Sequence, residues 1–341
     1  MSKLDELLAK KGTLLADGAT GTNLFDMGLT SGDPPEEWNV TQPEKIRTLH
    51  RKFVEAGADI ILTNTFGANR HRLKLHKLEG RVHELNRAAA ELAREVAAEA
   101  GREVIVAGSI GPTGELFAPL GALTYEEAVE AFAEQAEGLK AGGADVAWIE
   151  TMSAPEEMRA AAEAAAKVGM PFVVTASFDT AGRTMMGLPP SGLADLAGEF
   201  ACAPVAYGSN CGVGASDLLA AVLEITRDHP DAIVVAKANC GIPVIRGDEV
   251  VYTGTPELMA DYARLAVDAG ARIIGGCCGT SYAHLAAMRQ ALDGYEKGAR
   301  PSVEEVVARI GPLVSPPAAA PTDGGDGEGG RRRRRRGVRE A

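Results

Sequence analysis

One unit recurs along this 341-residue chain and constrains its fold more than any other feature: an alanine-rich amphipathic helix, a glycine, then a short apolar strand. Residues 52–63, 137–150 and 266–275 are three examples. A glycine just past a helix adopts the left-handed conformation that ends the helix. A continuous apolar strand suits a parallel sheet that is covered on both faces. The repeated unit therefore predicts an α/β fold with a parallel sheet.

The number of such units predicts how the sheet is arranged. Roughly eight strand–helix units fit a single-domain (β/α)8 TIM-type barrel. An open doubly wound sheet is the alternative, but no GxGxxG fingerprint follows the first strand, which disfavours it. The candidate strands are 13–16, 59–63, 103–108, 145–150, 171–176, 204–209, 232–237 and 271–275.

The end of the chain differs in composition from the rest. We expect the barrel to span residues 1–312 and a Pro/Gly/Arg-rich disordered tail to span residues 313–341, because the tail has little apolar surface to bury. Six consecutive arginines, Arg331–Arg336, could contact RNA or another acidic partner, or could remain solvated beside an acidic body. No aromatic residue interleaves them, which favours the solvated tail.

Charge and cysteine usage exclude several classes of protein. The net charge of −12 argues against nucleic acid as the main partner of the barrel. Five cysteines are an odd number and too sparse for a disulfide scaffold, which favours a reducing compartment where clustered cysteines bind metal or react. No stretch is apolar and long enough to span a bilayer. We expect a cytoplasmic protein with no membrane contact, and a homo-oligomer.

Residues capable of chemistry follow the predicted strands, where the active sites of such barrels lie. Two adjacent cysteines, Cys277 and Cys278, stand among glycines after the last strand. Neighbouring strand residues point to opposite faces, so the two sulfurs can converge only if the backbone turns there, as glycine permits. The other strand-end motifs are 17–22, 63–67, 108–112, 150–151, 210–212 and 239–241.

The cysteine pair predicts two ligands of a zinc site. A catalytic zinc keeps three protein ligands and one open position. Cys211 ends the sixth strand in an Asn-Cys-Gly turn and is the candidate third ligand, while Cys240, at the end of the intervening strand, competes with it. Cys202 lies in the expected helix before the sixth strand, where it would be a small buried apolar residue.

Three thiolates on Zn²⁺ leave a net charge near −1, which makes a poor Lewis acid but suits binding and deprotonation of a substrate thiol. The expected chemistry is therefore thiol activation followed by attack on an alkyl group. The alternatives are a structural zinc site, a redox pair or inert buried cysteines. Structural zinc sites usually have CxxC pairs and four protein ligands, and neither is evident in the sequence.

Five motifs together resemble the homocysteine S-methyltransferase family, which includes the homocysteine domain of methionine synthase, betaine–homocysteine methyltransferase and the S-methylmethionine-using enzymes. The resemblance covers about residues 10–295. The motifs are Asp17-Gly18-Ala19-Thr20-Gly21-Thr22, residues 55–66, Ile149-Glu150-Thr151, Asn210-Cys211 and residues 275–280.

The resemblance implies a (β/α)8 barrel with zinc on Cys211, Cys277 and Cys278. It implies that Asp17 and Glu150 meet the homocysteine ammonium and that Thr63 lies nearby. Read without the resemblance, Asp17 could equally cap a helix and Glu150 could be a solvated strand end. The implied reaction is attack of the zinc-bound homocysteine thiolate on a methyl donor, giving methionine without a protein general base.

The residues expected near the methyl donor depart from one branch of the family. Betaine enzymes of the family have aromatic residues around the quaternary ammonium, and Trp38 matches one of them, but Gly67 and Thr151 replace two others. We expect betaine or another small methylated compound as donor. The alternatives are a barrel that works with a separate methyl-corrinoid protein and, from another class, a non-catalytic zinc or thiol sensor that uses the arginine tail.

Overall fold

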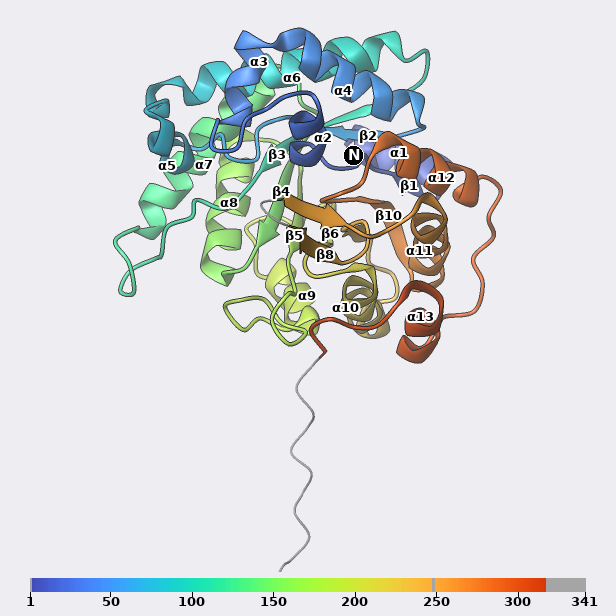
Figure 1. Ribbon diagram of the computed structural model, residues 1–341. Helices are drawn as coiled ribbons and strands as arrows, with labels where there is room; N and C mark the ends of the chain where they lie inside the picture. Colours follow the sequence, from blue (N-terminus) through green and yellow to red (C-terminus); the bar gives the residue numbers. More distant parts are fainter. Residues whose placement is uncertain (1, 247–248, 317–341) are drawn as a thin grey trace, which may run out of the picture.

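The computed structural model describes residues 2–246 and 249–316 and shows a closed parallel barrel (Figure 1). The sheet order is β1-β10-β7-β6-β5-β4-β3-β2, and every neighbouring pair is parallel. A bridge between Ala16 and Ile60 joins the first strand to the second, so the sheet closes on itself. The strands are β1 (Leu14–Leu15), β2 (Ile60–Leu62), β3 (Ile105–Ile110), β4 (Val146–Met152), β5 (Phe172–Ala176), β6 (Ala206–Cys211), β7 (Val234–Ala238) and β10 (Ala271–Gly276).

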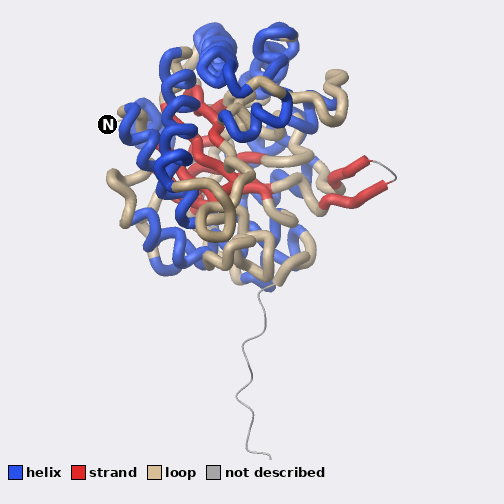
Figure 2. Tube along the Cα trace, turned by 90° about the vertical axis from the view of Figure 1, so that its left-hand side faces the viewer, coloured by secondary structure: helices blue, strands red, loops and turns tan. Residues whose placement is uncertain are grey.

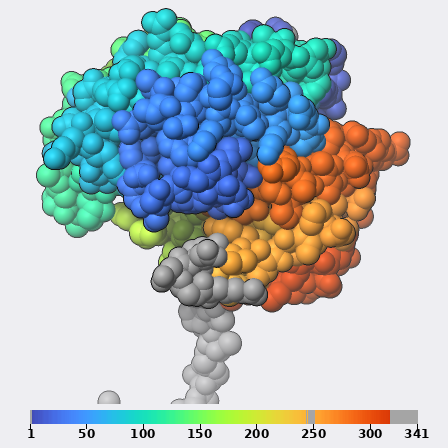
Figure 3. Space-filling model, turned by 45° about the horizontal axis from the view of Figure 1, so that its top comes forward, coloured from blue at the N-terminus to red at the C-terminus, as the bar shows by residue number. Residues whose placement is uncertain are grey.

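A helix follows each barrel strand and covers the outside of the sheet. The space-filling view shows the result of closure: the N-terminal segment, in blue, lies directly against the orange C-terminal segment (Figure 3). The predicted TIM-type barrel is therefore confirmed. The covering helices are α4 (Pro43–Glu55), α6 (Val82–Glu99), α7 (Tyr125–Ala141), α8 (Pro155–Val168), α9 (Pro190–Gly198), α10 (Ala215–Asp228), α11 (Pro256–Asp268) and α12 (Tyr282–Leu292).

Several additional helices lie outside the repeating strand–helix pattern. In the short helix η1, proline stands at the first position, where its missing N–H costs nothing. The additional helices are α1 (Lys3–Lys11), α2 (Gly21–Asp26), η1 (Pro35–Glu37), α3 (Trp38–Thr41), α5 (Arg70–Leu73), η2 (Lys74–His76), η3 (Glu79–Arg81) and α13 (Val303–Ile310).

Helix α1 closes the amino-terminal end of the barrel. Its buried leucines Leu4, Leu7 and Leu8 form one apolar cluster with barrel residues that include Trp148. Burying each leucine stabilises the fold by roughly 1.5–3 kcal/mol. A second, larger apolar layer lies between the strands and the outer helices. With one end filled, the carboxyl-terminal end of the strands remains for a binding site.

A two-stranded antiparallel hairpin interrupts the repeating pattern between β7 and α11. It consists of β8 (Pro243–Arg246) and β9 (Glu249–Tyr252), and Figure 2 shows it projecting from the body of the barrel. The eight-strand prediction leaves this hairpin out, because its strands pair only with each other.

The described chain ends against the barrel. The Val314 N–H and the Ser315 N–H both donate to Asp217, at 2.9 and 2.8 Å, and the Ala181 N–H donates to the Ser315 hydroxyl. The first residues of the predicted tail are thus anchored, while the remainder, including Arg331–Arg336, lies outside the described residues. Within the described part of the chain, no helix is long and apolar enough to cross a membrane.

Candidate active site

A cavity of about 400 Å³ opens at the carboxyl-terminal end of the strands. This is the end at which barrel enzymes of this architecture bind their substrates. The cavity is lined by the loop that follows β1, by η1, and by residues at or just beyond the carboxyl ends of β2, β3, β4, β6, β7 and β10. Its lining includes the predicted residues Thr63, Glu150, Cys211, Cys277 and Cys278.

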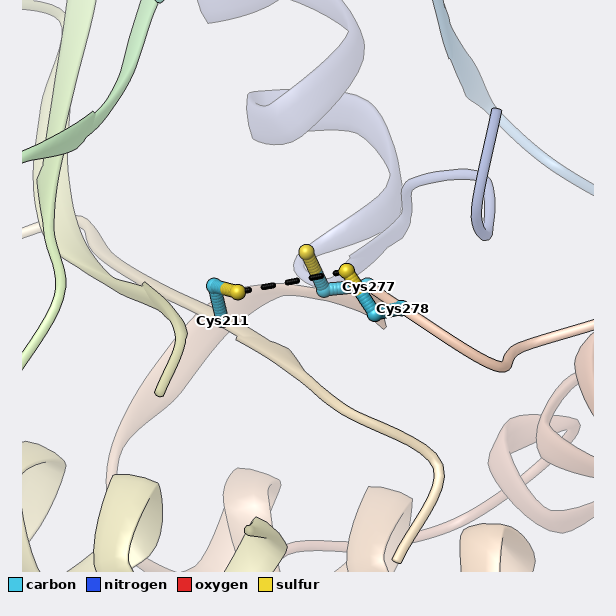
Figure 4. A group of neighbouring side chains, drawn as sticks. All are labelled: Cys211, Cys277 and Cys278. Carbon is cyan, nitrogen blue, oxygen red and sulfur yellow. Dashed lines mark hydrogen bonds between the residues drawn. The ribbon is translucent and has the colours of Figure 1, made fainter. Parts of the chain in front are cut away.

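The three predicted cysteine ligands converge on one point of this cavity (Figure 4). Their sulfur atoms all lie within 4.8 Å of one another, and the Cys211 and Cys278 sulfurs are 4.0 Å apart. Three sulfurs on a tetrahedral zinc ion, each bonded at ~2.3 Å, would be ~3.8 Å apart. The group therefore fits a zinc ion, and no further His, Cys, Asp or Glu of the described chain belongs to it.

Unusual backbone conformations place these sulfurs. Cys211 has a φ of +61°, a left-handed conformation that is costly for a residue with a side chain. The two neighbouring cysteines begin a tight turn in which the Thr280 N–H donates to the Cys277 carbonyl. A side chain at Gly276 would come within 2.3 Å of the Thr280 side chain, so the turn requires glycine there.

The three thiols share negative charge. Hydrogen bonds from Cys211 and Cys277 lower the pKa of Cys278. Hydrogen bonding to Cys211 and Cys278, together with burial, raises the pKa of Cys277. Hydrogen bonding within the group thus favours the thiolate form of Cys278, and the thiolate is the form that binds metal.

Asn239 links the two ligand-bearing turns. Its amide nitrogen donates to the Gly212 carbonyl at 2.6 Å, and its oxygen accepts from the Cys278 N–H at 3.0 Å. It lies at the end of β7, the strand between β6 and β10 in the sheet. Next to it, Cys240 is buried and contacts Cys278 through main-chain atoms, since the Cys240 N–H donates to the Cys278 carbonyl. Cys240 is not a member of the three-sulfur group.

Cys202 does not lie where the sequence suggests. It is exposed, and it follows α9 in an irregular segment that leads into β6. The interpretation of Cys202 as a small buried apolar residue is wrong, because α9 ends at Gly198 and the chain leaves the protein interior before residue 202.

Asp17 is paired with a buried lysine. The Lys237 ammonium donates to the Asp17 carboxylate at 2.8 Å, and both side chains are 2% exposed. The Leu62 N–H donates to the other Asp17 oxygen at 2.7 Å. Burial raises the pKa of Asp17, and the lysine opposes this rise. Burial disfavours the charged lysine too, but Asp17 and Glu150 outweigh it and raise the pKa of Lys237. Asp17 is thus part of an ion pair and does not cap a helix.

Glu150 is also buried, so it is not a solvated strand end. The Ser109 hydroxyl donates to one of its oxygens at 2.5 Å, and the Asn210 amide approaches the other at 3.5 Å. Burial raises the pKa of Glu150 to about 7, although Lys237 opposes the rise. No ion pair involves its carboxylate among the described residues. Glu150 is therefore a carboxylate at the cavity floor that a ligand cation could neutralise.

Thr63 lies in a buried hydroxyl network. Its hydroxyl contacts that of Thr65 at 2.6 Å and accepts from the Ser109 N–H at 3.0 Å, while Thr65 donates to the Ser109 carbonyl. The network fixes the end of β2 against the end of β3. Thr63 still lines the cavity, beside the hydroxyl that holds Glu150.

Comparison with known proteins agrees with this geometry. The family model described as homocysteine S-methyltransferase matches residues 14–292. The chain belongs to the homocysteine S-methyltransferase family. Membership makes it a methyltransferase and disfavours the alternative of a non-catalytic sensor.

Members of the family and related proteins differ in length. The methionine synthase of Mycobacterium leprae is 30% identical over 318 residues, covering 89% of this chain and 26% of that protein. The Mycobacterium tuberculosis methionine synthase is 31% identical, covering 87% and 26%. The chain thus spans about a quarter of the length of these relatives.

Solved structures of one bacterial family member match the whole barrel. The metallated form of the homocysteine methyltransferase MmuM from Escherichia coli is 28% identical, with a TM-score of 0.70, covering 84% of this chain and 99% of that one. Its oxidised form is 27% identical, with a TM-score of 0.71.

The residues that the family resemblance suggests for the methyl donor are only partly in the cavity. Thr151 lines it, with a φ of +60° that is fixed by hydrogen bonds to Asn210. Trp38 is not among the lining residues, and the Lys45 ammonium already lies 4.3 Å from the centre of its ring.

Sequence reasoning missed two charged residues of this family member's cavity, Lys237 and Glu36. Lys237 is the one charged residue of β7, an otherwise apolar parallel strand, and a buried lysine requires a partner, which was the available signal. Glu36 stands in an acidic pair with Glu37 and gave no comparable signal.

Proposed function

We propose that this chain is a zinc-dependent homocysteine S-methyltransferase that forms methionine from homocysteine and a methyl donor. The observation that carries the proposal is the three-cysteine group, which opens into a cavity that also holds a buried carboxylate, Glu150. Three thiol ligands, with no fourth ligand of the usual types among the described residues, leave a position for a substrate. Bound Zn²⁺ would supply a lowered pKa for the substrate thiol at neutral pH.

The remaining cavity residues would bind and orient homocysteine. Glu150 accepts the substrate ammonium, with Ser109 holding the carboxylate in place. Asp17 contributes to this negative region while paired with Lys237, and Thr63 orients the strand end beside it. The substrate sulfur then attacks the methyl carbon of the donor, the bond from that carbon to the donor breaks, and methionine leaves. No protein residue has to act as general base in that step.

Two candidates for the donor follow from the relatives. A small methylated compound, betaine among them, fits a cavity of about 400 Å³. A separate methyl-corrinoid protein is the second candidate, and the similarity to methionine synthases favours it. In either case the barrel would act within a cytoplasmic homo-oligomer.

The test is methionine formation from homocysteine with a panel of donors: betaine, S-methylmethionine and methylcobalamin. Each assay is run with zinc-loaded protein and with protein depleted by a chelator, and metal content is measured in parallel. We expect methionine with at least one donor only when zinc is bound. Full activity of the metal-depleted protein, or no methionine from any donor with zinc bound, would contradict the proposal.

A further inference from the structure

A second cavity lies beside α1 at the amino-terminal end of the barrel, the end opposite the three cysteines. Its volume is about 520 Å³, and it is bordered by the ends of α1, α11 and α12 and by the segments that lead into β1, β2 and β3. Ligand pockets in proteins typically occupy roughly 300–1,000 Å³. The cavity is therefore large enough for a small molecule, and it contains none of the residues assigned to methyl transfer.

Positive charge dominates the wall of this cavity. Of the described residues that line it, three are cations, Lys11, Arg102 and Arg289, and two are carboxylates, Asp59 and Asp293. The Asp293 side chain is 67% exposed, so solvent screens its contact with Arg289. The chain as a whole has a net charge of −12. A concave region with excess positive charge on such an acidic protein attracts anions.

The two arginines of the cavity are held in place by the main chain. One Arg102 nitrogen donates to the carbonyls of Val54 and Ala58, at 2.7 and 2.8 Å. The stem of Arg289 packs on Gly57, where a Cβ atom would come within 2.5 Å of the Arg289 Cγ atom. A ligand that binds to these guanidinium groups therefore does not have to order two mobile side chains, which lowers the entropic cost of binding.

Asp59 leaves part of the hydrogen-bonding capacity of these cations unused. The Lys11 ammonium donates to one Asp59 oxygen at 2.5 Å, and the Leu15 N–H donates to the other at 3.0 Å. The guanidinium nitrogens of Arg289 and Arg102 lie farther from this carboxylate, at 3.4 and 3.7 Å, than the usual ~2.7–3.2 Å. Because each guanidinium has about five N–H donors in total, both retain donors for another acceptor.

We propose that this cavity binds the phosphate group of a small phosphate monoester. Such a group carries a charge of about −1.5 to −2 at pH 7, and its oxygens match the paired donors of guanidinium groups. The apolar side chains of Val267 and Leu292 and the ring of Tyr295 line the rest of the cavity, where they would contact the organic part of the ester. The site is separate from the methyl-transfer cavity, so the proposal does not depend on the proposed function.

Isothermal titration calorimetry on the zinc-loaded, full-length protein tests the ligand class. The probes are adenosine 5′-monophosphate, ribose 5-phosphate, inorganic phosphate, adenosine and acetate. We expect the two esters to bind, inorganic phosphate to bind more weakly, and adenosine and acetate to show no binding. Absence of binding by both esters overturns the proposal, as does binding of adenosine or acetate as tightly as the esters. Binding of inorganic phosphate alone overturns the assignment to an ester.

Substitutions of the charged residues test the place of binding. We expect Lys11→Gln and Arg289→Gln each to weaken binding of the esters about 10- to 100-fold. Asp293→Asn removes a carboxylate that competes for Arg289, so it should strengthen binding several-fold. The matched control is Arg272→Gln, because Arg272 donates to the Gly12 carbonyl at 3.0 Å and does not line the cavity. This control should leave the affinity unchanged.

Circular dichroism and zinc content establish that each variant is folded. Asp293→Asn provides a test that a loss of folding cannot imitate, because its expected effect is a gain in affinity. Unchanged ester affinity in folded Lys11→Gln and Arg289→Gln proteins, or an equal loss in Arg272→Gln, would show that the esters bind elsewhere and overturns the site.

Discussion

At the amino-terminal end of the barrel the interior is filled by α1 and the buried Asp59 is paired with cations, whereas at the carboxyl-terminal end the interior opens into a cavity and, among the described residues, two buried carboxylates have no ion pair. Asp59, at the first end, is buried and contacts Lys11, Arg102 and Arg289. Glu36 and Glu150, at the second end, are also buried and form no ion pair among the described residues. A buried carboxylate is thus neutralised by the protein at one end and has no cationic partner among the described residues at the other.

The open end also contains the less favourable backbone conformations. Cys211 and Thr151 have positive φ values of +61° and +60°, and both line the cavity. Such conformations cost roughly 1–3 kcal/mol each and persist only where the surroundings enforce them. Apolar packing at the filled end therefore stabilises the fold, while the strained backbone and the buried charge at the open end destabilise it. This is expected where binding residues are carried by loops on a rigid scaffold.

The largest expected effect is loss of the ligand group at the open end. Cys278→Ala removes one of three sulfurs, so we expect zinc binding and methionine formation to fall together to background. Metal analysis of the purified variant and the homocysteine assay check this. The exposed Cys202, changed to alanine, is the matched control and should retain both. A Cys278→Ala protein that is fully active without zinc would rule out the assignment of the site.

A cavity mutation at the filled end should have the opposite pattern. Leu7 is 1% exposed in the plug formed by α1, so Leu7→Ala should lower the free energy of unfolding by about 2–5 kcal/mol. Urea unfolding measures this loss. Zinc stoichiometry of the folded variant should stay unchanged, because the substitution lies at the opposite end of the barrel. Loss of zinc from a still-folded Leu7→Ala protein would mean that the two ends are not independent.

The two ends also differ in how far the sequence reveals them. The helix–glycine–strand period predicts all eight barrel strands, because each strand is buried on both faces and therefore continuously apolar. The period contains no information on the β8–β9 hairpin, whose strands pair only with each other. At the open end, Cys211, Cys277 and Cys278 are found from their turn motifs.

Charge pairing at the open end cannot be predicted in the same way. Lys237 meets Asp17 across 220 positions of sequence, and Glu36 meets Gly67 across 31, so neither contact leaves a local pattern. The prediction for Cys202 fails for a different reason. The sequence predicts a helix at this position, but α9 ends before residue 202 and leaves the cysteine exposed. Local periodicity therefore predicts the strands and helices of the barrel. Contacts between residues distant in sequence form only when the barrel closes, so local periodicity does not predict them.

The cost of burying the Glu150 charge can be measured from the pH dependence of the folding stability. Its folded pKa of about 7 lies above the ordinary value of 4.5, so the folded protein holds the proton more tightly than the unfolded chain does. The associated stability is complete below pH ~4.5 and is lost as the pH rises through 7, a total of about 3 kcal/mol. Glu150→Gln should remove this loss.

Urea unfolding of the metal-free proteins at pH 5 and pH 8 checks the sign. The stability of Glu150→Gln relative to the wild type should increase from pH 5 to pH 8. Asp59→Asn, at the filled end, removes the carboxylate that pairs with Lys11 and Arg102, and should lower the stability at both pH values. A constant difference between Glu150→Gln and the wild type across this range would show that the Glu150 charge is compensated after all.

The smallest expected effect concerns the residue that holds the ligand turns together. Asn239→Ala removes the bridge between Gly212 and Cys278 but no sulfur, so zinc should still bind, about 10- to 100-fold more weakly. Competition with a chromophoric chelator measures this affinity. Asn86→Ala is the matched control, since Asn86 is buried and donates two main-chain hydrogen bonds away from the cysteines. Both variants lose a buried amide, so a weaker zinc affinity in Asn239→Ala alone would show that Asn239 positions the ligands beyond any effect on general stability. Equal affinities in the two variants would show that the strained conformation of Cys211 is maintained without Asn239.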